Sequence, residues 1–161
     1  MIHVCFVCLG NICRSPLAQG VFEQLVAQEG LEDRIQITSA GTGNWHVGSP
    51  PDARMQKTAN RYGVQLNSRG QQIQSTDFFE LDLILAMDHS NLTILEQICP
   101  NPGEAEKLRL FRSFDPQANG DLDVPDPYYG GGRGFEIVYQ IVERTCPKIL
   151  EFLKTQANLS A

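Results

Sequence analysis

The sequence predicts an α/β fold built on a parallel sheet, and two observations carry that prediction. Short apolar runs alternate along the chain with segments whose apolar residues recur at helical spacing, which is typical of strand–helix–strand units. The run Leu83–Met87 is apolar throughout, as expected for a central strand that is buried on both faces. At 161 residues, with no internal repeat and no linker-like stretch, residues 1–161 are expected to form one domain.

The first half of the chain predicts two strands and two helices. The apolar run Ile2–Val7 indicates a buried strand, and a helix is predicted over about 16–28. Arg34–Ser39 alternates apolar and polar side chains, which favours a strand nearer the edge of the sheet. The Gly- and Pro-rich stretch 41–51 predicts a loop, and Pro51 then opens a helix that Gly63 ends.

The second half adds two strands and two helices. After the strand Leu83–Met87, Asp88 begins a helix; its position at a strand end also suits a functional role, but helix capping explains it equally well. Leu108–Phe111 predicts a short last strand. The chain is then rich in Asp, Pro and Gly over 115–134, and an apolar stripe predicts a final helix from Phe135 to about Leu153.

The loop between the first strand and the first helix carries the chemistry. It reads Cys8-Leu9-Gly10-Asn11-Ile12-Cys13-Arg14-Ser15-Pro16. A helix N-terminus binds anions because its first N–H groups lack helical partners and its dipole is positive there. Gly10 and Asn11 tolerate the backbone angles that turn N–H groups inward, and Arg14 offers a planar fork for two phosphate oxygens.

The same loop is equipped to activate a thiol. Ser15 is expected to cap the helix or to donate its hydroxyl to the Cys8 sulfur, and Pro16 suits the first helical position. A thiol that faces a helix N-terminus and an arginine has its pKa lowered from about 8.5 to roughly 3.5–7.5. Cys8 is therefore predicted to be a nucleophilic thiolate, the alternative being a buried cysteine in a tight turn.

The segment Cys8–Pro16 resembles the phosphate-binding loop of the low-molecular-weight protein tyrosine phosphatases. The later segment Asp126-Pro127-Tyr128-Tyr129-Gly130 fits the same family, and the resemblance covers nearly the whole chain. It implies a four-stranded parallel sheet with helices on both faces and the phosphate-binding loop between the first strand and first helix. It also implies hydrolysis of phosphotyrosine through a phosphocysteine on Cys8. In such a loop, the residues expected to bind substrate are Leu9, Gly10, Asn11, Ile12, Cys13 and Ser15.

Asp126 is the predicted general acid and base. Two prolines bracket it and fix its backbone, which suits a carboxyl group held over a pocket, whereas Asp121 and Asp123 read as solvated turn residues. Expelling a phenolate with a conjugate-acid pKa near 10 calls for a proton, and general acid catalysis contributes roughly 10²–10⁴ in rate. Arg14 would stabilise the charge on the transferring phosphoryl oxygens.

Aromatic residues are expected to wall the pocket. Trp45 lies in a Gly-rich loop at a strand end, where ligands bind in open α/β sheets, and the family resemblance gives it an aryl-binding role. Its alternative role is a loop anchor, and His46 is a specificity residue at most. Tyr128 and Tyr129 follow the acid and are predicted to form the opposite wall. In relatives, such tyrosines can be phosphorylated.

A supporting network is implied by the resemblance. Ser39 is expected to hydrogen-bond Asn11 and to help hold its strained backbone. Mammalian relatives place a histidine near the position of Ser68, so the outer part of the network differs here.

The five cysteines have no metal-ligand spacing, and neither metal nor cofactor is expected. The resemblance implies a reversible Cys8–Cys13 disulfide that protects the nucleophile from over-oxidation, the alternative being that Cys13 only packs. Cys5, Cys99 and Cys146 are expected to be small core residues.

Charge and hydropathy limit the kinds of partner that the protein is expected to bind. The net charge of −6 argues against nucleic acid, and the lack of a signal segment or an apolar run near 18 residues argues against a membrane span. With five cysteines, a reducing, cytoplasmic location is expected. The predicted partners are tyrosine-phosphorylated proteins, with inorganic phosphate as a product.

Two other functions remain as alternatives. A thiol-dependent arsenate reductase can share this loop and fold, but such reductases relay through two further cysteines on a mobile segment. Cys99 and Cys146 lie far apart in the sequence and do not form such a pair. A non-enzymatic phosphotyrosine-binding module would not need the nucleophile, the arginine and the acid together.

Overall fold

Four parallel strands form one sheet in the order β2-β1-β3-β4. The computed structural model describes residues 1–129 and 131–159, and Tyr129 by its backbone alone. The strands are β1 (Ile2–Cys8), β2 (Ile35–Gly41), β3 (Leu83–Ala86) and β4 (Leu108–Leu110). The predicted edge position of the second strand and the interior position of the third are confirmed.

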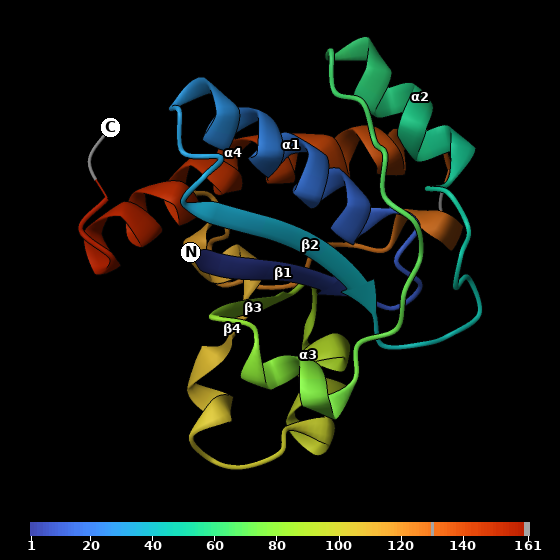
Figure 1. Ribbon diagram of the computed structural model, residues 1–161. Coiled ribbons are helices and arrows are strands. Elements are labelled where there is room, and N and C mark those ends of the chain that lie inside the picture. The colour runs from blue at the N-terminus through green and yellow to red at the C-terminus, as the bar shows by residue number, and fades with distance from the viewer. Residues whose placement is uncertain (130, 160–161) are drawn as a thin grey trace.

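Helices cover both faces of this sheet, as predicted (Figure 1). The α-helices are α1 (Arg14–Gln28), α2 (Ala53–Arg61), α3 (His89–Ile98) and α4 (Arg133–Gln156). Short 3₁₀ helices lie at Ser75–Phe79, Glu104–Lys107, Phe111–Phe114 and Pro127–Tyr129. The helices α1 and α4 pack together on one face, with α2 beside them, and α3 lies on the other. Within the described residues, no helix combines the length and apolar character needed to cross a bilayer.

Alternation along β1 divides the core into two layers. Val4, Phe6 and Cys8 belong to the larger hydrophobic cluster, which includes side chains of α1 and α4. Cys5 and Val7 point to the opposite cluster, which includes Leu95 of α3. This is the two-residue period of a strand that is buried on both faces.

Several element boundaries differ from the prediction. The helix α1 begins at Arg14, so Ser15 and Pro16 lie inside its first turn, where the missing N–H of proline still costs no hydrogen bond. The helix α2 begins at Ala53 because the Asp52 carboxylate accepts a hydrogen bond from the Arg54 N–H and caps the helix. The strand β2 continues past Ser39 to Gly41.

The carboxyl ends of β1 and β3 meet at the point where the strand order reverses. The chain leaves β1 to form β2 on one side, and β3 then pairs with β1 on the other side. Open α/β sheets bind ligands in the crevice outside such a point. Cys8 ends β1 there, and Asp88 follows β3.

Candidate active site

The loop from Cys8 to Arg14, here named the phosphate loop, is held in a strained backbone conformation. Asn11 has a φ of 55°, in the left-handed region that was expected for this residue. Gly10 has no positive φ, so the expected use of glycine for a left-handed backbone angle is wrong at this position. A Cβ at Gly10 would lie 3.1 Å from Cδ2 of His46, so any larger residue would require the imidazole to shift by a few tenths of an ångström.

Hydrogen bonds fix the Asn11 side chain from three directions. Its amide nitrogen donates to the hydroxyls of Ser15 at 2.8 Å and Ser39 at 3.0 Å, so the predicted Ser39 contact is confirmed. Its carbonyl oxygen accepts from the Gln71 N–H at 3.0 Å. The Ser39 hydroxyl in turn donates to Gln19 at 2.6 Å. Gln71 and Gln19, not the residue near Ser68, form the outer part of this network.

The Cys8 sulfur lies at the N-terminus of α1, 3.0 Å from the Ser15 hydroxyl. The expected Cys8–Ser15 contact is therefore present, but the predicted capping role of Ser15 is wrong. Cys13 is the N-cap residue, and no side chain caps the helix. The first N–H groups of α1 are thus not satisfied by a cap, which is the condition for binding an anion.

Arg14 is buried and oriented by two fixed acceptors. Its Nη1 donates to the Asp88 carboxylate at 2.7 Å and to the Val124 carbonyl at 2.9 Å. Burial opposes the charged guanidinium, but the Cys8 sulfur and the Asp88 carboxylate outweigh it and raise the Arg14 pKa above its ordinary value. Arg14 therefore remains a cation beside the sulfur.

Asp88 serves two elements at once. One carboxylate oxygen binds Arg14, and the other accepts the Asn91 N–H at 2.8 Å and caps α3. The predicted cap is confirmed, and the contact with Arg14 is a finding that the sequence did not predict. Its position directly after a central strand was the available signal, since functional residues gather at such strand ends.

Asp126 lies across the crevice from the phosphate loop, on the segment Asp115–Tyr129, here named the acid loop. Its Oδ1 accepts the Tyr128 N–H at 3.0 Å, and its Oδ2 lies 3.7 Å from Nη2 of Arg14. The loop is attached to the sheet just before Asp126, because the Val124 N–H donates to the Met87 carbonyl at 2.8 Å. Asp121 is exposed, as expected, whereas Asp123 is half-buried and binds the His89 N–H and imidazole.

A cavity of about 340 Å³ joins these groups. It is lined by Cys8, Leu9, Gly10, Ile12, Cys13, Arg14, Trp45, His46, Asp126 and Tyr128. Three predicted loop and support residues do not line it. Asn11, Ser15 and Ser39 are buried behind the loop, so a substrate-binding role for Asn11 and Ser15 could come only from their backbone. The Tyr129 side chain lies outside the described part of the chain.

Trp45 is 69% exposed, although it lines the cavity. A Cβ on Gly43 would overlap the indole ring, so the ring rests directly on the glycine backbone. An aromatic face that remains solvent-accessible at the rim of a cavity is available for a flat ligand. Trp45 thus lines the cavity and also packs on its own loop, and its aryl-binding role stays a prediction.

Cys13 is a neutral thiol in this arrangement. Burial raises its pKa first, and the nearby charges of Asp52 and Cys8 raise it further. Cys5 and Cys146 are fully packed, as predicted, whereas Cys99 is only partly buried at the end of α3.

The fold and loop define the class: an α/β protein with a Cys-x5-Arg loop between its first strand and first helix. The chain belongs to the low molecular weight phosphotyrosine protein phosphatase family, whose model matches residues 3–159. A low molecular weight protein-tyrosine-phosphatase of Streptomyces coelicolor is 45% identical over 97% of this chain and 96% of its own. A rat relative, named a low molecular weight phosphotyrosine protein phosphatase, is 44% identical over 92% of this chain and 93% of its own.

A solved structure agrees with the whole fold. A protein tyrosine phosphatase from Entamoeba histolytica, crystallised with Hepes in its active site, superposes with a TM-score of 0.92 at 36% identity. The match covers 99% of this chain and 100% of that one.

Proposed function

We propose that the protein is a tyrosine phosphatase that hydrolyses phosphotyrosine in proteins through a phosphocysteine on Cys8. The main support for this proposal is that Cys8, Arg14 and Asp126 line one cavity. Family membership supports the reaction and the substrate class. The Hepes in the Entamoeba structure supports it too, since Hepes bears a sulfonate, a tetrahedral anionic group like a phosphate ester.

In the first step, the Cys8 thiolate attacks phosphorus, an S–P bond forms and the bond to the phenolic oxygen breaks. The Arg14 fork and the N–H groups of the α1 N-terminus hold the phosphoryl oxygens throughout. Asp126, protonated, gives its proton to the departing oxygen, so the product leaves as a neutral phenol. The Ser15 hydroxyl at 3.0 Å holds the sulfur in place before the attack and stabilises it when it leaves again.

In the second step, water attacks the phosphocysteine. Asp126, now a carboxylate, accepts the proton of the water, the S–P bond breaks and inorganic phosphate is released. The enzyme returns to its starting state with Cys8 as thiolate and Asp126 protonated. Arg14 stays fixed by Asp88 and Val124 during both steps, so little reorganisation is needed as charge develops.

Aromatic walls explain a preference for aryl esters. Trp45 and Tyr128 both line the cavity above the phosphate loop, where a phenyl ring would lie once its phosphate is bound. His46 lies against Gly10 at the base of the Trp45 wall. A flat ring gains contact with such walls that a short alkyl phosphate does not.

Trapping the phosphoenzyme tests this mechanism. Rapid quenching during turnover of a labelled aryl phosphate should yield label on the peptide that contains Cys8, in a burst that matches the enzyme concentration. Label on another residue, or phosphate release without any labelled enzyme, would contradict the phosphocysteine. A parallel assay with arsenate and a thiol donor should give no reduction.

We also propose a redox role for Cys13 and a cytoplasmic location. Hydrogen peroxide oxidises the Cys8 thiolate to a sulfenic acid and releases hydroxide, and the Cys13 thiol then attacks that sulfur to form the disulfide with loss of one water. Both sulfurs belong to residues that line the same cavity, and the reaction needs a compartment that restores the thiols. Peroxide treatment followed by mass mapping should give a Cys8–Cys13 bridge, whereas Cys8 sulfinic acid without a bridge would refute it.

A further inference from the structure

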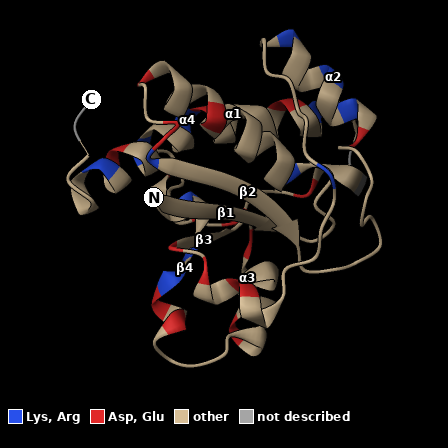
Figure 2. Cartoon of the chain, in the orientation of Figure 1, with Lys and Arg blue, Asp and Glu red and all other residues tan. Residues whose placement is uncertain are grey.

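Charge is distributed unevenly along the chain. Residues 35–76 carry four Lys or Arg and one Asp, a net charge of +3, whereas the other 119 residues carry nine Lys or Arg and eighteen Asp or Glu, net −9. The four cations are Arg54, Lys57, Arg61 and Arg69. Three of them lie on α2, and Figure 2 shows the blue segments along that helix. The positive charge therefore gathers on and beside α2.

This basic surface begins at the rim of the active-site cavity. The Asp52 N–H donates to the Ile12 carbonyl at 2.8 Å, which fixes the start of α2 against the phosphate loop. The Arg54 guanidinium lies 5.3 Å from the ring centroid of Tyr128, a residue that lines the cavity. From there α2 leads away from the cavity, with Lys57 and Arg61 exposed along it.

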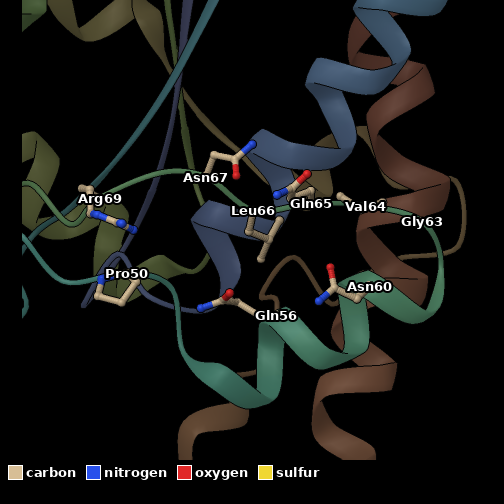
Figure 3. A pocket seen from close by; sticks show the side chains of 9 residues that line it. All are labelled: Pro50, Gln56, Asn60, Gly63, Val64, Gln65, Leu66, Asn67 and Arg69. Carbon is tan, nitrogen blue, oxygen red and sulfur yellow. The ribbon is translucent and has the colours of Figure 1, made fainter.

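A groove of about 570 Å³ lies between α2 and the segment 63–69 that follows it (Figure 3). The amides of Gln56 and Asn60 line it from α2, and Asn67 and Arg69 line it from the facing segment. Such amides both donate and accept hydrogen bonds, which suits the N–H and C=O groups of an extended peptide. This groove, lined by Pro50, Gln56, Asn60, residues 63–67 and Arg69, is named the α2 groove.

The α2 groove adjoins the wall of the cavity. The Gly70 N–H donates to the Ser49 carbonyl at 2.8 Å, and the Gly48 N–H donates to the Gly70 carbonyl at 2.8 Å. These bonds place the Arg69 end of the groove against the loop that carries His46. A chain with its phosphotyrosine in the cavity can therefore pass over this wall into the groove.

Two of the four cations are available to a partner. Arg54 is held by Asp52 at 3.0 Å and Arg61 by Glu136 at 3.1 Å. Lys57 and Arg69 are exposed and have no carboxylate partner among residues 1–129 and 131–159. Arg69 lines the α2 groove, and Lys57 follows Gln56, which lines the same groove, so both cations lie close to a segment bound there.

We propose that the α2 groove and its two flanking cations bind the segment beside the phosphotyrosine of a substrate protein and favour segments rich in Asp and Glu. The inference rests on the proposed phosphatase function, because phosphotyrosine in the cavity anchors that segment. An extended chain rises about 3.3 Å per residue, so acidic side chains within a few positions of phosphotyrosine reach α2. A flat anionic membrane fits less well, because the site is concave and the remaining residues carry a net charge of −9.

Matched phosphotyrosine peptides test the proposal. One carries three Glu on each side of the phosphotyrosine, and the other carries Gln at the same positions. The wild-type protein should show a kcat/KM about three- to tenfold higher for the Glu peptide, since exposed ion pairs are each worth roughly 1.4- to 5-fold. The ratio should fall toward one as salt shortens the screening length.

Variants assign the effect to α2. K57Q with R69Q should bring the two peptides to equal kcat/KM and leave turnover of p-nitrophenyl phosphate unchanged. K148Q on α4, which removes an exposed cation elsewhere, should keep the full preference. Equal rates on the two peptides in the wild-type protein, or an equal loss in K148Q, would overturn the proposal.

Two further outcomes distinguish a failure of the peptide proposal from a failure of the proposed phosphatase function and from membrane binding. Lack of turnover on both peptides and on p-nitrophenyl phosphate would refute the phosphatase function itself. Retention on phosphatidylserine vesicles, together with equal rates on the two peptides, would assign the basic surface to a membrane and overturn the peptide proposal.

Discussion

In the proposed mechanism the phosphate loop and the acid loop carry the two halves of one reaction, yet the structure holds them very differently. The Arg14 side chain is 3% exposed and is fixed by two acceptors, whereas the Asp126 side chain is 31% exposed and its carboxylate is held by one backbone N–H and by Arg14 at 3.7 Å. The difference fits their tasks. A group that stabilises developing charge must be in place beforehand, whereas a group that gives and takes a proton must remain within reach of both the leaving oxygen and water.

The largest expected effect comes from removing the proposed nucleophile, Cys8, from the phosphate loop. C8S should lower kcat on an aryl phosphate by roughly 10⁴-fold or more, because a serine hydroxyl in this position has no base to activate it. Binding of phosphate should persist, since the loop N–H groups and Arg14 remain. The control is C99S, at the partly buried cysteine that ends α3, which should keep wild-type rates. Substantial turnover by C8S would contradict the mechanism.

Removing the proposed acid, Asp126, should slow some substrates more than others, depending on the leaving group. D126N should slow hydrolysis of phenols with a high pKa by roughly 10²–10⁴-fold and that of p-nitrophenyl phosphate less, since a good leaving group needs no proton. D121N, on the same loop and exposed, is the matched control. A loss that is equal for all leaving groups would rule out the acid role.

The Arg14 anchor is the next test. D88N should keep the hydrogen-bonded cap of α3 but remove the charge that pairs with Arg14, and kcat/KM should fall by about 10-fold with weaker vanadate inhibition. D123N, which removes a carboxylate that binds the N-terminus of α3, should not weaken vanadate binding. An unchanged vanadate affinity in D88N would show that Val124 alone orients the guanidinium.

The base of the acid loop should contribute mainly to stability. The Asp115 side chain is buried with Arg112 and Arg144, and Arg112 also donates to the Asp123 carbonyl at 2.9 Å. Burial raises the Asp115 pKa, but the arginine and Gln117 hydrogen bonds outweigh it, so the pKa is lowered on balance. D115N should cost about 3 kcal/mol at pH 7, because it removes the buried carboxylate that Arg144 and Arg112 share, and within the described residues Arg112 keeps only the exposed carboxylate of Asp121 at 3.4 Å.

The lowered pKa of Asp115 predicts how the stability loss in D115N changes with pH. A lowered folded-state pKa stabilises the protein above the unfolded value of about 3.9, and the stabilisation is lost as pH falls through the folded value. Urea unfolding should therefore show the D115N deficit in full at pH 7 and a smaller one near pH 3. A deficit that is constant over this range would mean that packing, not charge, accounts for it.

The smallest expected effect concerns the Asn11 network. N11G allows the positive φ but removes three hydrogen bonds, so the free energy of unfolding should fall by about 1–3 kcal/mol. N11A should be worse, because alanine also strains the backbone at φ 55°. Thermal melts of the two variants check the order, and equal melting temperatures would show that the backbone conformation costs little.

The sequence was informative where neighbouring residues determine the outcome. The strands, the helix order and the Cys8–Arg14 loop follow from local apolar periodicity and from residue types, and the structure contains them. The helix boundaries moved because capping depends on a single side chain, as Asp52 shows for α2.

Contacts between distant residues were beyond local reasoning. Gln71 binds Asn11 across 60 positions, and Asp88 binds Arg14 across 74. No local pattern at Gln71 signals a partner so far away, and at Asp88 the position at a strand end signals a functional residue without naming Arg14 as its partner. The tight contact between Gly10 and His46 is of the same kind, because it joins two loops that lie far apart in the sequence.

The bare backbone beneath the indole of Trp45 has an evolutionary consequence. A methyl group at position 43 would tilt the ring and reshape the entrance, while the sulfur, guanidinium and carboxyl would stay where they are. A single substitution at Gly43 can therefore change which phosphate esters fit the entrance, although Gly43 takes no part in the reaction.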